Sequence, residues 1–237
     1  MNLEFWLIGK QMNKVAILCR GKSLAGIEFL PDDIDLFILV NRFGDELKID
    51  EIGSYLENKN IYQVLSRVPD EADGMIRHKF YSKYNIQKMI QPYTIHMKNP
   101  HDFSDGNNRF YRFIDDKFYF CGEGEPISAE WLGDHHIDYM DNYQDRYPHH
   151  YPSSGNAAIG YATLDLKPKE LYIIGMDFYE VGYLADGGPG GPEVTHRMKE
   201  SLSRLIDGHE NIKFTVITCG DYKEKKDNLE IVSLEEI

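Results

Sequence analysis

The sequence predicts an α/β fold: a single Rossmann-like domain, residues 1–237, built on a parallel sheet. Two apolar runs, Asp35–Asn41 (DLFILVN) and Leu171–Met176, are typical of strands that are buried on both faces. The run Val15–Leu18 (VAIL) is β-branched and leads into a glycine turn. Strands of this kind alternate with stretches of helical spacing, which favours a doubly wound sheet.

The elements of the first third follow in order from these patterns. After the first strand, CRGKSL is expected to form a tight turn that opens a short helix over Ser23–Leu30. The stretch DELKIDEIGSYLENK has apolar residues at helical spacing, and IYQVLSRV after it is predicted to be a third strand.

The middle, from Asp70 to Tyr151, is rich in Tyr, Phe, His, Asp and Asn and has poor periodicity. We expect irregular helices and loops there, as an insertion over about 70–151 that forms either a lid or an acceptor-facing surface. Order returns at PSSGNAAIGYATLDL, where Ser153 or Ser154 is a good N-cap and Gly155 allows a close backbone approach. KELYIIGM, THRMKESLSRLIDGH and IKFTVIT then predict strand, helix and strand.

Charge and cysteine content exclude several classes of protein. The net charge of −13 argues against a general nucleic-acid or anionic-membrane binder, but a small anionic ligand needs only local donors. Three cysteines predict neither a disulfide framework nor a thiolate metal site. The N-terminal apolar segment is short and carries Glu4, so we expect no membrane span and a cytoplasmic protein, with homo-oligomerisation left open.

Two helix starts have the residues of an anion site. A glycine turn that enters a helix, as at Gly21, leaves backbone N–H groups that suit a phosphate. The PSSG stretch repeats this device, with hydroxyls added. Each turn alone is explained by an ordinary strand-to-helix connection or helix cap, whereas two in one chain favour an anionic ligand between them.

The stretch GMDFYEVGYLADGGPGGPEVTH places two tyrosines, Tyr179 and Tyr183, before a glycine-rich segment and His196. A phenol can hydrogen-bond a leaving phosphate without a metal, and an imidazole can take up a proton near neutral pH. A glycine-rich lid over about 180–195 would let such a site close. Together these residues predict group transfer from an activated donor, although loop tyrosines also pack on surfaces without any such role.

No resident metal or cofactor is predicted. The DID sequence at Asp33–Asp35 leads directly into a buried strand, which favours surface turn residues over a metal-binding DxD motif. The paired histidines His135–His136 and His149–His150 point to opposite sides in extended structure, and HxxxH and HExxH spacings do not occur.

Three stretches, VAILCRGKSLAGIEFLPDDIDLFILVN, SSGNAAIGYATLDLKPKELYIIGMDFYE and THRMKESL, resemble the bacterial lipooligosaccharide sialyltransferases and, more distantly, the sialyl motifs of the animal enzymes. The resemblance covers the N-terminal quarter and roughly Pro152 to Leu205. It implies a single nucleotide-binding domain, a variant of the GT-A-like fold, with a mobile lid. It also implies transfer of sialic acid from CMP-sialic acid to a glycan, with inversion and without metal.

The resemblance also implies roles for individual residues. His196 corresponds to the general base, and Tyr179 and Tyr183 to two tyrosines that bond the departing phosphate. The resemblance implies that Gly21, Ser23, Asn41, Ser154 and Gly155 bind the donor, and we add as donor-binding candidates Arg20, Lys22, Ser153 and Asp177.

The first turn departs from the family pattern, which usually reads GNGPS. Arg20 and Lys22 stand where that pattern has asparagine and proline. Two cations there either supply positive charge to the same donor or indicate a different one.

Two alternative functions stay open. One is a Mg²⁺-dependent transferase of the pyrophosphokinase type, with Asp177 as a metal ligand. The other is a nucleotide-binding module without catalytic activity. A requirement for metal would favour the first, and nucleotide binding without turnover the second.

Overall fold

The computed structural model describes residues 12–41, 43–64, 83–91, 153–185 and 192–234, and four further strand segments at 103–104, 110–114, 117–121 and 136–139. The chain divides into two compact units, Met1–Ile38 with His149–Ile237, and Leu39–Pro148. Because the boundary falls within strand β2 (Leu36–Val40), the expected single domain stays a prediction.

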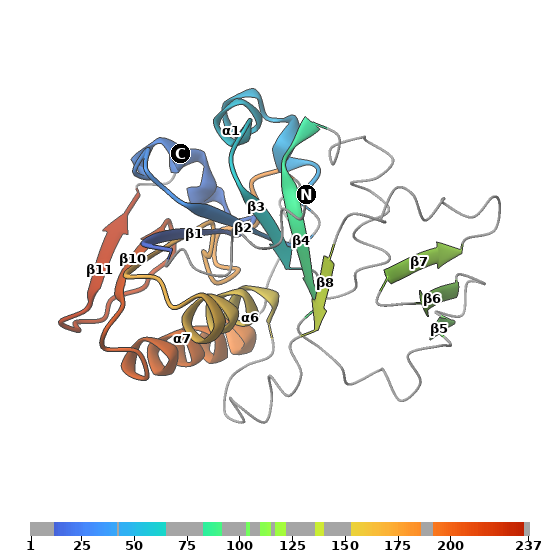
Figure 1. Ribbon diagram of the computed structural model, residues 1–237. Coiled ribbons are helices and arrows are strands. Elements are labelled where there is room, and N and C mark those ends of the chain that lie inside the picture. Colours follow the sequence, from blue (N-terminus) through green and yellow to red (C-terminus); the bar gives the residue numbers. More distant parts are fainter. Residues whose placement is uncertain are drawn as a thin grey trace. The chain divides into compact units, whose positions relative to one another are not determined.

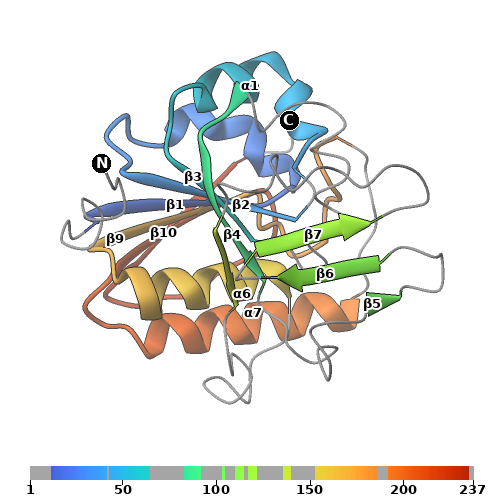
Figure 2. The same ribbon diagram turned by 45° about the vertical axis from the view of Figure 1, so that its right-hand side comes forward.

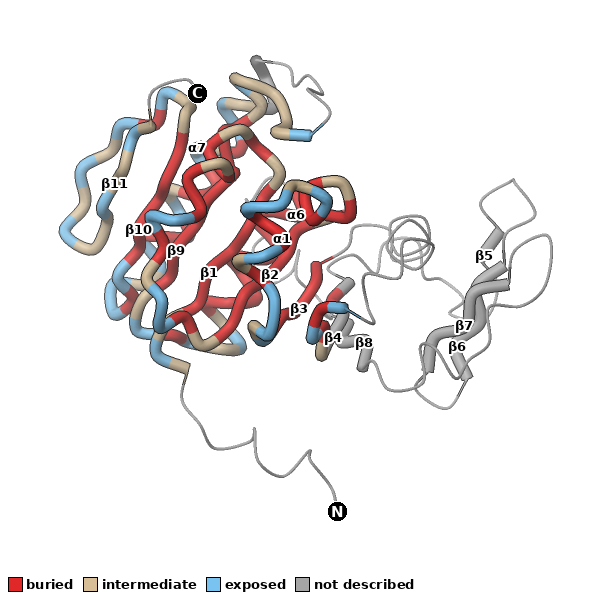
Figure 3. Tube along the Cα trace, turned by 90° about the horizontal axis from the view of Figure 1, so that it is seen from above, coloured by how far each residue is buried: buried red, intermediate tan, exposed pale blue. Residues whose placement is uncertain are grey.

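The first unit is centred on parallel strands (Figure 1). Strand β1 (Lys14–Leu18) pairs with β9 (Glu170–Ile174), β9 with β10 (Lys213–Thr218), and β10 with β11 (Leu229–Ser233), each in parallel. Figure 3 shows β1, β9 and β10 buried along most of their length. These are the continuous apolar runs that the sequence predicts to be buried strands, and the predicted α/β parallel sheet is confirmed.

Helices cover both faces of this part of the sheet. Figures 1 and 2 show α6 (Ser154–Tyr161) and α7 (Pro192–Asp207) side by side on one face, and the 3₁₀ helix η2 (Lys22–Phe29) on the other. A π-helical turn, η4 (Ala162–Leu166), prolongs α6. The small residues Ala157 and Ala158 are fully buried, which lets α6 approach the sheet closely.

The second unit contains a helical segment and further strands. The 3₁₀ turn η3 (Glu46–Lys48) and helix α1 (Asp50–Leu56) precede β3 (Ile61–Val64). Strands β3, β4 and β8 pair in parallel, and β5, β6 and β7 form an antiparallel sheet of their own. Their bounds are β4 Ile86–Gln91, β5 Phe103–Ser104, β6 Phe110–Ile114, β7 Lys117–Cys121 and β8 His136–Tyr139. The order of the main sheet is β11-β10-β9-β1-β2-β3-β4-β8.

The structure corrects the prediction of irregular helices and loops over 70–151. The residues described in that range include five strands, and two of these, β4 and β8, belong to the main sheet. Strands β6 (FYRFI) and β7 (KFYFC) are dense in aromatic residues, which favour strands even where polar residues do not alternate with them. Strand β11 has no counterpart in the sequence prediction, and α7 begins three residues before the expected Thr195.

A buried carboxylate joins the carboxyl ends of three strands. Asp177, which follows β9, is 2% exposed. Its Oδ2 accepts from the backbone N–H of Ser23, at 2.8 Å, in the helix that follows β1. Its Oδ1 accepts from the Thr218 hydroxyl and the Cys219 N–H at the end of β10, both at 3.0 Å.

The Ser23 side chain makes a second connection at the same place. Its hydroxyl donates to the carbonyl of Ile217 at 3.1 Å and accepts from the N–H of Gly175 at 2.9 Å. The segments after β1, β9 and β10 are therefore held together by hydrogen bonds whose partners are 41 to 194 residues apart in the sequence.

Replacing Asp177 tests this arrangement. Asp177→Ala is expected to lower the free energy of unfolding by about 3 kcal/mol or more, because three donors, two buried and one partly buried, lose a charged acceptor. Urea unfolding followed by circular dichroism measures the change.

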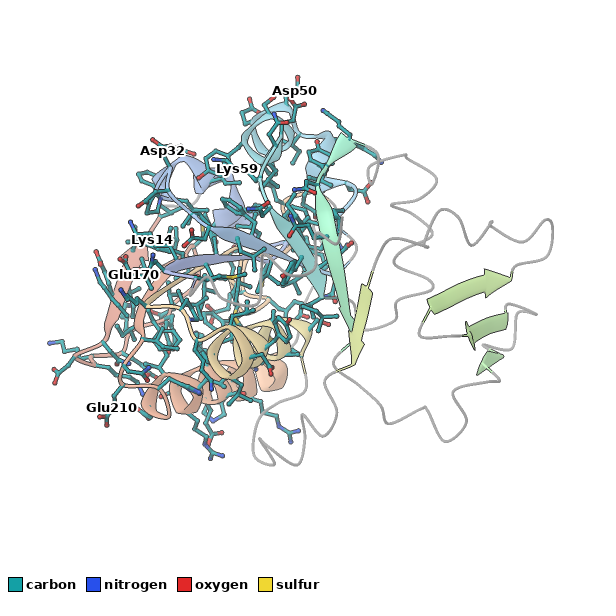
Figure 4. All side chains as sticks on the ribbon, in the orientation of Figure 1. Lys14, Asp32, Asp50, Lys59, Glu170 and Glu210 are labelled. Atoms are coloured by element: carbon teal, nitrogen blue, oxygen red, sulfur yellow. The ribbon has the colours of Figure 1, made fainter. Side chains whose placement is uncertain are left out.

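Asp33→Ala is the matched control. Asp33 pairs with Lys14 on the surface and is 70% exposed, and Figure 4 shows Lys14 among the outlying side chains. The denaturation midpoint of this variant should barely move. Equal midpoint shifts in the two variants would contradict the proposed importance of Asp177.

Candidate functional site

Two glycines let the turn after β1 approach the end of β9. The N–H of Gly21 donates to the carbonyl of Gly175 at 2.7 Å. A Cβ on Gly21 would lie 2.4 Å from Asp177 Oδ2, and one on Gly175, where φ is +75°, would lie 2.2 Å from the carbonyl oxygen of Cys19. No side chain fits at either position.

These contacts correct one expectation about the first turn. The N–H groups of Gly21 and Ser23, predicted to be free for a phosphate, are used by Gly175 and by Asp177. Asp177 in turn has both oxygens occupied by protein donors. Sequence inspection could not detect this, because Ser23 and Asp177 are 154 residues apart.

A strained turn follows Asp177. Phe178 and Tyr179 both have left-handed backbone conformations, with φ of 54° and 62°. Each costs about 1–2 kcal/mol in a residue that has a side chain, and such strain clusters at functional sites. The Glu180 N–H donates to the carbonyl of Asp177 at 2.9 Å and closes the turn.

The tyrosine loop pairs with the first turn. The rings of Tyr179 and Tyr183 meet edge to face with centroids 5.8 Å apart, and the Arg20 guanidinium lies 4.8 Å from the centre of the Tyr183 ring. The N–H of Leu184 donates to the carbonyl of Arg20 at 2.7 Å, and Gly21 forms an antiparallel bridge with Tyr183. The structure thus brings together a cation and two tyrosines that the sequence singles out separately.

The start of α6 lies at the same end of the strands. Ser153 is the N-cap, and its hydroxyl oxygen accepts from the N–H of Asn156 at 3.1 Å. A Cβ on Gly155 would lie 3.4 Å from Cys19 Sγ and 3.5 Å from Met176 Cε, so α6 begins beside the ends of β1 and β9. The first N–H groups of a helix, here those of Ser154 and Gly155, have no partner within the helix.

The start of α7 is bonded to the tyrosine turn. The Thr195 hydroxyl donates to the carbonyl of Phe178 at 2.6 Å, and Lys199 Nζ donates to Glu180 Oε1 at 2.7 Å. His196, next to Thr195, is exposed. Thr195, Glu180 and Lys199 are not predicted from the sequence, because no local pattern reveals their partners. Of the predicted lid, residues 186–191 lie outside the described residues, and those from Pro192 onward are helical.

Asn41 and Lys22 are two further residues of the predicted donor site. Asn41 belongs to the second unit, has φ of 61°, and its buried Oδ1 has no hydrogen-bond partner among the described residues. Its backbone is fixed, since its N–H donates to the carbonyl of Val64 and its own carbonyl accepts from Gln63. Lys22 opens η2 and is partly exposed.

The described residues contain no group of three or more His, Cys, Asp or Glu side chains suited to a metal ion. Within the same part of the chain, no helix has the length and apolar character needed to cross a bilayer. The side chains of both histidine pairs lie outside it.

No protein-family model and no curated protein matches this chain. Three solved sialyltransferase structures are similar in fold. CstII from Campylobacter jejuni with the substrate analogue CMP-3FNeuAc has a TM-score of 0.52 and 20% identity, over 86% of this chain and 81% of that one. A point variant of Cst-II with CMP gives 0.56 and 17%, and Cst-II with a trisaccharide acceptor and CMP gives 0.54 and 17%. Both alignments cover 94% of this chain and 95% of the other. At these identities the likeness concerns the fold.

Because α6 packs on β1, we expect the thiol of Cys19 to be unreactive in the folded protein. Burial, assisted by the nearby charge of Asp177, raises the pKa of the Cys19 thiol to about 12. In a Cys121→Ser/Cys219→Ser variant, Cys19 should therefore resist iodoacetamide at about pH 8 until the protein unfolds. In the unfolded chain the thiol has a pKa of about 8.5. The buried, protonated thiol of Cys19 therefore contributes fully to the free energy of unfolding below that pH, and this contribution is lost as the pH rises toward 12.

A variant that keeps Cys219 and has serine at positions 19 and 121 is the control. Cys219 is partly exposed and should be labelled in the folded state. Rapid labelling of Cys19 in folded protein would show that α6 does not cover it.

Proposed function

We propose that this protein is a glycosyltransferase that moves sialic acid, or a related acidic sugar, from a CMP-activated donor to a glycan hydroxyl. The observation that carries the proposal is the grouping of Arg20, Tyr179 and Tyr183 where β1 and β9 end. Ligands of open α/β sheets bind at the carboxyl ends of the strands. Support also comes from the similarity in fold to sialyltransferases solved with CMP.

In this proposal the cluster of Arg20, Tyr179 and Tyr183 binds the leaving phosphate. The guanidinium supplies a fixed positive charge, and the phenol of Tyr179 supplies a neutral hydrogen bond. CMP departs with a single phosphate, so one or two cations, Arg20 and Lys22, can balance its charge without Mg²⁺. A diphosphate leaving group carries more charge and typically recruits a divalent ion.

His196 is proposed as the general base. The acceptor hydroxyl attacks the anomeric carbon, and the imidazole takes the hydroxyl proton as the new carbon–oxygen bond forms. The bond between the sugar and the phosphate breaks, and its electron pair leaves on CMP. Attack from the face opposite the phosphate inverts the configuration, through a state with oxocarbenium character.

The remaining donor contacts are divided between binding and support. Ser154 and Gly155 are proposed to offer N–H groups to the donor, and the donor contact expected of Asn41 stays a prediction. We propose that four other predicted donor-binding residues support the structure of the site instead: Gly21, Ser23, Ser153 and Asp177. The N–H groups of the first two, the Ser153 hydroxyl and the Asp177 carboxylate already have hydrogen-bond partners within the protein.

The pyrophosphokinase alternative loses its main candidate ligand. It needs acidic side chains for Mg²⁺, and Asp177, the residue considered for that role, already accepts three hydrogen bonds from the protein. A non-catalytic nucleotide binder remains as an outcome of the experiments below.

Calorimetry with CMP, UMP, GMP and AMP, with and without EDTA, tests the donor class. CMP should bind more tightly than the other nucleotides, and EDTA should leave its affinity unchanged. A transfer assay with CMP-sialic acid and galactose- or sialic-acid-terminated acceptors should then give product. Mg²⁺-dependent binding or preference for an adenine nucleotide would refute the proposal, and CMP binding without turnover would favour the binding module.

Variants of the two proposed catalytic residues should differ in which reaction they impair. Tyr179→Phe weakens departure of the phosphate, so transfer and donor hydrolysis should both fall about tenfold to a hundredfold, the worth of one hydrogen bond to a charged group. His196→Ala should lower transfer by about 10²–10⁴-fold and leave CMP affinity nearly unchanged.

Tyr172→Phe and His209→Ala are the controls. Tyr172 lies on the same strand as the residues before Tyr179 but bonds Glu170, and His209 follows the far end of α7 and contacts the carbonyl of Leu205. Both should transfer sugar at the wild-type rate. Wild-type transfer by His196→Ala would remove His196 from the mechanism.

A further inference from the structure

A side-chain hydrogen bond links the neighbours of the two proposed catalytic residues. The Thr195 hydroxyl donates to the carbonyl of Phe178 at 2.6 Å. Thr195 directly precedes His196 in α7, and Phe178 directly precedes Tyr179 in the left-handed turn. The bond therefore joins the first turns of the helix that carries the proposed base to the turn that carries the phosphate-binding phenol.

A second group of contacts fixes the same two segments. Lys199, one turn further along α7, donates to Glu180 Oε1 and to the carbonyl of Asp221. Glu180 Oε2 accepts from the N–H of Asp221 at 2.7 Å. The ammonium also lies 5.4 Å from the centre of the Phe178 ring, and that ring is 1% exposed and packs on Tyr222 at 5.1 Å.

These contacts make the strained turn rigid. Left-handed conformations in residues with side chains persist only where the surroundings hold them. The Phe178 ring and Glu180 fix the position of the turn, and Lys199 and Thr195 bond two successive turns of α7 to it. Removal of the Thr195 hydroxyl alone would leave the turn and the Lys199 contacts in place, but the start of α7, which carries His196, would lose its own bond to the tyrosine turn.

We propose that Thr195 is a positioning residue that holds His196 in register with Tyr179 during sugar transfer. The inference rests on the proposed function and names how its two catalytic groups are aligned. General-base attack requires the imidazole within hydrogen-bond distance of the acceptor hydroxyl, and a displacement of about 1 Å can cost a hundredfold in rate. Departure of the phosphate depends on the Tyr179 side and does not need this alignment.

Thr195→Val removes the hydroxyl and keeps the shape of the side chain. We expect kcat for transfer to fall about tenfold to a hundredfold, with the CMP dissociation constant and the KM for donor within about twofold of wild type. Hydrolysis of CMP-sialic acid by water should persist, so the ratio of transfer to hydrolysis should fall. Thr195→Ser, which restores the donor group, should recover most of the lost transfer.

Thr163→Val is the matched control. Its hydroxyl also donates to a main-chain carbonyl, that of Gly160 at 3.1 Å, in the helical segment after α6. It should keep the wild-type ratio of transfer to hydrolysis, even if its melting temperature falls. Circular dichroism on all variants separates loss of alignment from loss of folding.

The outcomes distinguish this inference from the proposed function. If wild-type protein transfers sugar and Thr195→Val does so equally well, the inference alone is wrong. It is also wrong if Thr195→Ser is as impaired as Thr195→Val, or if transfer and hydrolysis fall together. If the wild-type protein itself shows no reaction of CMP-sialic acid, the proposed function fails first, and the inference with it.

Discussion

The buried carboxylate of Asp177 is the constraint on which the rest of the site depends. A carboxylate that is 2% exposed is stable in a protein interior only if hydrogen bonds replace its hydration, and Ser23, Thr218 and Cys219 provide three of them. Those donors follow two strands on either side of β9 in the sheet. One side chain therefore sets the positions of three loops, and the tyrosine turn begins at the very next residue.

The three loops fixed by Asp177 help to hold the next two residues in an unfavourable backbone conformation. Phe178 and Tyr179 are both left-handed, and their turn is anchored by Asp177 before it, by the buried Phe178 ring within it, and by Glu180 after it. Natural sequences usually place glycine or asparagine in such conformations. The presence of two aromatic residues in these conformations indicates a requirement for their side chains at that location.

The sequence predicted the parts of this structure that local patterns encode. Strands β1, β2, β9 and β10, the Ser153 cap and the close approach at Gly155 follow from apolar runs and from the chemistry of helix starts. The aromatic strands β6 and β7 were missed because their pattern matches neither simple period. The hydrogen bonds from the Gly21 and Ser23 N–H groups were not predicted, because their acceptors, Gly175 and Asp177, are far away in the chain. The roles assigned to His196 and Tyr179 stay predictions.

The same long-range contacts give a physical reason for the two cations in the first turn. With the amides of Gly21 and Ser23 committed to the protein, an anion bound there would need other donors. Arg20 carries five N–H groups and a permanent charge, and the Tyr183 ring 4.8 Å away favours one location of that charge through a cation–π contact. On the proposed function, Tyr183 then acts mainly through its ring, as a platform for Arg20, and Tyr179 through its hydroxyl. Two tyrosines in edge-to-face contact can therefore have different roles, one in holding Arg20 and the other in bonding the phosphate.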